Sequence, residues 1–66
     1  MLLTITMENF DKEFFVGDND ERAARALAVF LSTKGTLHPQ IEYFASHLNG
    51  KSAEAFREEC DRLGTL

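Results

Sequence analysis

The segment from Asp18 to Gly35, DNDERAARALAVFLSTKG, predicts the helix around which the rest of the chain is organised. Asp18 or Asn19 can accept the free amide protons of a first helical turn, and Glu21 follows Asp18 by three residues, as in a capping box. Gly35 can adopt the left-handed conformation that ends many helices. We therefore expect a helix over residues 19–34.

The apolar residues of this segment recur at helical spacing and predict its buried face. The centre of this face is formed by Ala23, Leu27, Phe30 and Leu31. The face is widened by Ala26, Val29 and Thr33. A helix with so wide an apolar face is buried on most of its surface. The other elements are therefore expected to pack on it.

The chain has 66 residues, enough for one domain with a small core. A chain of this length buries only about 60% of the surface that its unfolded form exposes, so its stability is marginal. Its hydrophobic fraction of 44% is too high for a disordered protein. We expect a single folded domain that gains stability from oligomerisation, for instance as a homodimer, or from docking on a larger partner.

The first part of the chain has the pattern of two strands. Apolar residues alternate with polar ones at Leu3, Ile5 and Met7. Glu13–Val16 is a second run rich in strand formers, and Asn9–Lys12 has turn composition. The pattern favours a β-hairpin over residues 2–16 and an α+β fold.

A helix is the alternative for the same segment. Four large apolar residues also recur at helical spacing: Leu3, Met7, Phe10 and Phe14. The fold would then be all-α, with four short helices. The threonines and the adjacent pair of phenylalanines favour the hairpin.

Two further helices are predicted after the central one. His38 before Pro39 is typical of an N-cap and a first helical position, and predicts a helix over residues 39–48. Ser52 as N-cap predicts a helix over residues 53–63. Their apolar stripes are Ile41, Phe44, Ala45 and Leu48, then Ala53, Phe56, Cys60 and Leu63.

The net charge of −4 is concentrated near the amino end. Residues 8–21 contain six acidic side chains and one lysine, whereas residues 22–66 contain six basic and five acidic ones. Such a patch repels nucleic acid and membrane surfaces and attracts a basic protein surface, over roughly 8 Å at physiological salt. We therefore expect a protein partner with a basic surface, and no membrane.

No residue pattern predicts catalysis, a cofactor or a metal site. His38 and His47 would lie about 14 Å apart along a helix, too far to share a metal ion. Cys60 falls on an inward stripe, and Glu58 and Glu59 beside it should raise its pKa, which opposes thiolate chemistry. We expect a protein that is not an enzyme, with His38 as a cap and His47 stacked on a tyrosine four residues earlier.

A single cysteine cannot form an intramolecular disulfide, which favours a reducing compartment. The apolar residues that open the chain are interrupted by Thr4, Thr6 and Glu8, before a signal-peptide core or a membrane span could form. These observations predict a cytoplasmic protein.

A helix-turn-helix regulator is one alternative, because two predicted helices are joined by a short turn. The would-be recognition helix, residues 39–48, has no lysine or arginine, and Glu42 would face phosphate. Lys51, Arg57 and Arg62 could form a basic stripe, but acidic neighbours favour surface ion pairs instead. Direct nucleic-acid binding is therefore not expected.

The acidic run combined with exposed aromatic residues is the best candidate for an interaction surface. In a hairpin with Phe14 inside, Phe15 points outward. The candidate protein-binding residues are Glu8, Asp11, Glu13, Phe15, Asp18, Asp20 and Tyr43. Another possibility is a structural homo-oligomer or assembly subunit, in which Phe15 and Tyr43 are buried against a second copy.

A compact acidic chain without motifs, with a hairpin followed by short helices, resembles the small phage-encoded inhibitor proteins, of which anti-CRISPR proteins are the best-known group. The resemblance covers size, charge and architecture, and assigns no role to any residue. It implies an inhibitor that binds a host protein in the host cytoplasm, presenting carboxylates to a basic groove meant for nucleic acid. With the residue pattern, it predicts a protein-binding module that acts on a host protein complex.

Overall fold

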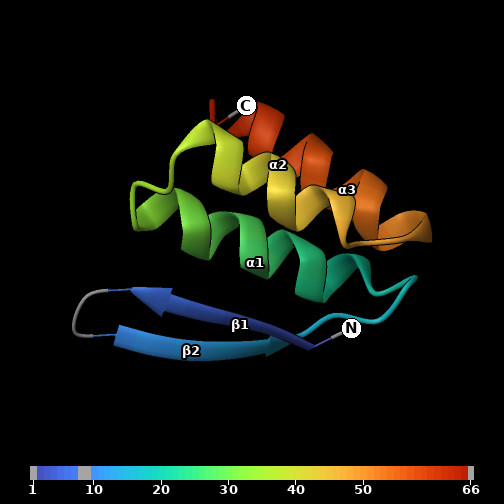
Figure 1. The fold of residues 1–66 in the computed structure, drawn as a ribbon. Coiled ribbons are helices and arrows are strands. Elements are labelled where there is room, and N and C mark those ends of the chain that lie inside the picture. The colour runs from blue at the N-terminus through green and yellow to red at the C-terminus, as the bar shows by residue number, and fades with distance from the viewer. Residues whose placement is uncertain (1, 8–9, 66) are drawn as a thin grey trace.

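A computed structural model describes the backbone of residues 2–7 and 10–65 and the side chains of residues 13–65. In this part of the chain the elements are β1 (Leu2–Met7), β2 (Phe10–Phe15), α1 (Glu21–Thr33), α2 (His38–Ser46) and α3 (Gly50–Arg62). Figure 1 shows the strands on one side of α1, with α2 and α3 on its other side. The chain is mostly helical, and the prediction of three helices is confirmed.

β1 and β2 run antiparallel, and the last described pair before their connection joins Met7 to Phe10. This differs from the predicted hairpin, in which Asn9–Lys12 formed the turn, because β2 already begins at Phe10. Residues 8 and 9 lie outside the described residues. From Phe10 onward the predicted turn residues belong to β2, where the ladder with β1 provides backbone hydrogen bonds. The alternative of a fourth helix is wrong, since both described runs are extended.

α2 begins one residue earlier than predicted, at His38, with Leu37 as its N-cap. The capping role predicted for His38 is wrong, and no side chain bonds the first turn of this helix. Leu37 already has the extended backbone of an N-cap, and Pro39 in the first turn has no amide proton to satisfy. The helix ends at Ser46, two residues before the predicted end.

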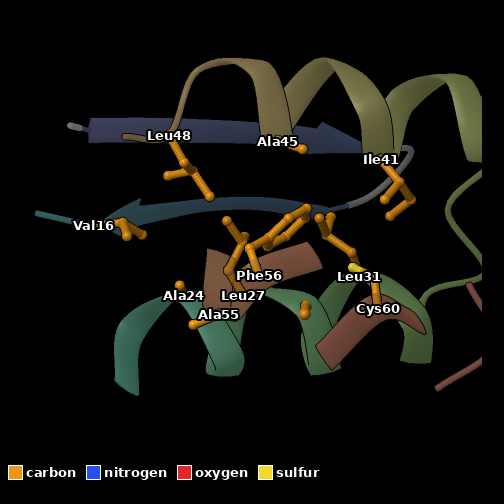
Figure 2. Close-up of a cluster of buried hydrophobic side chains, with 11 residues drawn as sticks. Val16, Ala24, Leu27, Leu31, Ile41, Ala45, Leu48, Ala55, Phe56 and Cys60 are labelled. Carbon is orange, nitrogen blue, oxygen red and sulfur yellow. The ribbon is translucent and has the colours of Figure 1, made fainter. Parts of the chain in front are cut away.

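The core lies between the three helices and the end of β2. Figure 2 shows side chains of α2 directed toward α1 and α3. The predicted inward stripe of α2 is confirmed for Ile41, Ala45 and Leu48, and Phe44 packs against the core. On α3 it is confirmed for Phe56 and Cys60, which are fully buried, whereas Leu63, the C-cap of the helix, is 37% exposed.

The predicted central set of α1 is confirmed, because Leu27 and Leu31 are fully buried and Ala23 and Phe30 are partly buried against the core. The fully buried residues also include Ala24 and Ala28. Ala26, Val29 and Thr33, which were predicted to widen the buried face, are exposed. α3 packs closely along the side of α1 that carries Ala24 and Ala28, because small side chains allow a short distance between helix axes.

Candidate interaction surface

Two adjacent phenylalanines at the end of β2, Phe14 and Phe15, point to opposite sides of the strand. The Phe14 ring packs against that of Phe30 on α1, with 5.2 Å between centroids. Phe15 is 71% exposed, and Glu13 is exposed as well. Because alternate residues of a strand face the same side, Glu13 and Phe15 share the side of β2 that faces away from α1.

The chain then enters a loop that carries two more of the predicted site residues. Val16 is buried, while Asp18 and Asp20 are exposed. Asp20 is the N-cap of α1, and its Oδ1 accepts a hydrogen bond from the Ala23 amide at 3.0 Å. The predicted caps of this helix, Asp18 and Asn19, are therefore wrong. Asp20 contributes to the fold as well as to the acidic surface.

Asp18 and Asn19 instead bind the first turn of α3. The Ser52 amide donates to the Asp18 carbonyl at 3.1 Å, and the Lys51 amide donates to Asn19 Oδ1 at 3.2 Å. Gly50 has a φ of +57°, and a Cβ there would lie 2.8 Å from both acceptor oxygens. The loop is thus held against a helix more than thirty residues further along the chain.

This contact also explains why Ser52 is not the predicted N-cap. α3 begins at Gly50 with Asn49 as its N-cap, and Ser52 lies in its first turn. The Ser52 side chain is fully buried, and its hydroxyl donates to the Asn49 carbonyl at 2.7 Å. The loop bonds the amides of Lys51 and Ser52, which have no partner within a helix that begins at Gly50, so the helix starts earlier than predicted.

The carboxylates of the loop and of β2 contrast with those of α2 and α3. The ion pairs among the described side chains involve Glu42, Glu58 and Glu59. In the same set, residues 13–65, no ion pair is formed by Glu13, Asp18 or Asp20. Their negative charge therefore stays available to attract a basic partner.

A network that the sequence analysis missed joins α1 to α3. Arg25 donates to Glu58 and to Glu59, at 3.1 Å each, and Arg62 also pairs with Glu59. The hydrogen bonds from Arg62 and Arg25 hold the pKa of the buried Glu59 carboxyl below its ordinary value, against the opposing effect of burial. Arg25 is thirty-four residues from Glu59, and no local pattern indicates such a pairing.

Two residues of the predicted basic stripe, Arg57 and Arg62, form ion pairs with glutamates. Arg57 pairs with Glu42 of α2 at 3.2 Å, and Arg62 pairs with Glu59 on its own helix. The predicted pairing with an acidic neighbour on the same helix is confirmed for Arg62 and wrong for Arg57. For Arg57 the partner lies across a helix interface rather than one turn away.

Tyr43 lies on α2 and not on the strand and loop that carry the other candidates. Its side chain is 59% exposed and stacks on His47, with 4.4 Å between ring centroids, which confirms the predicted contact. Glu8 lies outside the described residues, and Asp11 belongs to β2 but its side chain is outside the described part. The structure thus groups Glu13, Phe15, Asp18 and Asp20 within one strand end and the following loop.

The Cys60 thiol has an environment that opposes reaction. It is fully buried, and desolvation, followed by the charges of Glu59 and Glu42, raises its pKa to about 11. Of the two glutamates predicted to act on it, Glu59 does so. Among the residues that the structure describes, no group of three or more His, Cys, Asp or Glu side chains could hold a metal ion.

Within the described residues, no helix is both long enough and apolar enough to cross a membrane. Comparisons of the chain with protein-family models, with curated proteins and with solved structures found no match. The candidate site therefore rests on the geometry of this chain alone, and the resemblance to phage-encoded inhibitors stays a prediction.

Proposed function

We propose that this protein is a small protein-binding module whose contact surface is formed by Glu13, Phe15, Asp18 and Asp20, and whose partner has a basic surface. The observation that carries the proposal is the exposure of Phe15. Its neighbour Phe14 is packed on α1, whereas Phe15 leaves most of its ring in water. Large aromatic side chains supply much of the binding energy at protein interfaces, and an exposed one beside carboxylates is suited to that role.

The carboxylates around Phe15 would guide the approach of a basic partner. Charges at the rim of an interface mainly raise the association rate and select the partner, while the buried aromatic supplies affinity. The loop with Asp18 and Asp20 is held by α3 and by the cap of α1, so little entropy would be lost when a partner binds. The surface therefore combines carboxylates that attract a basic partner, an aromatic ring that the partner can bury, and a loop that is held in place.

An inhibitor of a host protein complex is the narrower form of this proposal. An acidic surface with an aromatic anchor can occupy a basic groove that otherwise receives nucleic acid. The resemblance to small phage-encoded inhibitors in size, charge and architecture supports this form, and it would place the protein in the host cytoplasm.

Affinity capture from a bacterial lysate with matched variants tests the proposal. The test variants are Phe15→Ser and the charge reversal Glu13→Lys/Asp18→Lys. The matched control, Glu54→Lys/Asp61→Lys, changes the net charge equally at exposed residues of α3. We expect one set of proteins to be captured by the wild type and the control and lost with both test variants.

The salt dependence of capture distinguishes the contribution of the carboxylates to binding from that of the buried Phe15 ring. Between about 0.05 M and about 0.5 M salt the screening length falls roughly threefold, so capture through the carboxylates should weaken. Capture that is equal for all variants at both salt concentrations would contradict the proposed surface. Circular dichroism of each variant verifies that a loss of capture is not a loss of fold.

A further inference from the structure

We infer that the outer edge of β2 receives an extended segment of the partner protein, in which basic residues alternate with apolar ones. The inference rests on the proposed function and specifies the chemistry of the partner at that surface. It follows from three features that meet at one place: a strand edge, an exposed apolar stripe on α1 and the charge of β2.

The first feature is the edge itself. The described sheet has the order β1–β2, so β2 pairs with β1 on one side and has an outer edge on the other. β2 packs against α1, and Figure 2 shows β1 on the side of β2 that is nearer to α2. An isolated pair of strands is only marginally stable, and here β2 is supported by α1 on one face while its outer edge has no described neighbour. A strand added beside β2 would extend the sheet under α1.

The second feature is the stripe of α1 beside this edge. Ala26 follows Ala23 by three residues and precedes Phe30 by four, so it adjoins the side of α1 that packs on β2. Val29 continues the stripe and is 44% exposed. The spacing of these residues predicts burial, yet the described part of the chain leaves them in water. Apolar residues on one face of an added strand would cover them.

The third feature is the charge on the opposite face of β2. Glu13 and Phe15 face away from α1, and residues directly opposite each other on neighbouring strands share a face and interact. A lysine or arginine opposite Glu13 would form a favourable pair, and its charge could also lie over the Phe15 ring. The two faces together require apolar and basic residues in alternation.

A second copy of this chain is a poor occupant of the edge. In the two longest two-fold registers, antiparallel pairing of β2 with its own copy would place Lys12 opposite Lys12 or Glu13 opposite Glu13. Like charges in directly opposed positions destabilise a sheet. The edge of β2 therefore favours a different chain with the complementary pattern.

The probe is a synthetic peptide, acetyl-KVKVKVK-amide, and its control is the isomer acetyl-KKVVVKK-amide, which has the same charge and composition. Binding to the full chain is measured by titration calorimetry. We expect the alternating peptide to bind about tenfold more tightly than its isomer, a difference of about 1.4 kcal/mol. Equal affinity of the two peptides would show attraction by charge alone and overturn the inference.

Variants of the full chain locate the binding site. Val29→Lys should weaken binding of the alternating peptide about tenfold, and so should Glu13→Lys, while Glu54→Lys on α3 should leave it unchanged. If the variant Glu13→Lys does not fold, Glu13→Gln replaces it in the peptide titration. Unchanged binding to Val29→Lys would overturn placement of the peptide under α1.

The peptide titration and the lysate capture fail independently. Capture that depends on Glu13 and Phe15, together with equal binding of both peptides, would leave the proposed function standing and reject strand addition. Capture that ignores Glu13 and Phe15 would reject the proposed function itself.

Discussion

The substitution Gly50→Ala tests how the loop before α1 is joined to α3. Gly50 has a φ of +57°, and a methyl group there would lie 2.8 Å from the Asp18 carbonyl oxygen and from Asn19 Oδ1. Both oxygens accept amide protons of the first turn of α3. The methyl group must therefore displace the loop and lengthen both hydrogen bonds.

Gly35 provides a matched control for this substitution. Its φ is +70°, but nothing lies within 4 Å of the position that a Cβ would occupy. Gly35→Ala should cost about 1 kcal/mol, because a left-handed backbone is unfavourable for alanine. Gly50→Ala incurs the same backbone cost and the loss of two hydrogen bonds worth roughly 1 kcal/mol each, so we expect about 3 kcal/mol.

Urea denaturation followed by circular dichroism measures both variants. A slope of about 1 kcal/mol per molar urea translates the difference between them into roughly 2 M in the midpoint. A chain of this size is stable by only about 3–10 kcal/mol, so Gly50→Ala could unfold while Gly35→Ala stays folded, which is the same result in a stronger form. Equal destabilisation by the two substitutions would refute the close contact between the loop and α3.

Three further predictions concern the core residues Phe56 and Cys60 and the ion-paired Glu59. Phe56→Ala should lower the free energy of unfolding by about 3–5 kcal/mol, because Phe56 is fully buried, and urea titration measures this loss. Cys60 should react with a thiol reagent only after unfolding, because burial raises its pKa to about 11, and absorbance of the released chromophore with and without denaturant checks it. Glu59→Gln should make stability less sensitive to acid. The pKa of Glu59 is lowered in the folded protein, so its stabilisation is present above the pKa of an unfolded glutamate and is lost as the pH falls through the lowered value. Urea titrations of the wild type and the variant at neutral and acidic pH test this, and parallel losses would contradict it.

Predictions that depended on a repeating apolar pattern were the most successful. The stripe of Ile41, Ala45 and Leu48 and the burial of Phe56 follow from helical spacing, which is a property of the local chain. The N-caps were predicted less well. A capping side chain is chosen among several nearby polar residues, and that choice depends on what else those residues bind.

The candidate surface could be predicted in part. The adjacent phenylalanines indicate that one of them faces solvent, because neighbouring residues of a strand point to opposite sides. Which carboxylates among residues 13–65 form no ion pair could not be predicted, since Arg25 and Arg57 find their partners on other helices. Tyr43 was predicted to belong to the surface because it is aromatic, yet it lies on α2 and not on the strand and loop that carry Phe15 and Asp18.

Local patterns in the sequence were sufficient to predict three helices and the residues of α2 that face the core, because periodicity and helix-ending glycines act over a few residues. Only the packing of the helices established on which side the buried face of α1 is widened, that Asp18 and Asn19 bind α3 instead of α1, and which acidic side chains among residues 13–65 form ion pairs. These outcomes depend on groups that are distant along the chain and meet only when the helices pack. For that reason the exposed surface around Phe15 is defined by what the core and the ion pairs leave unused.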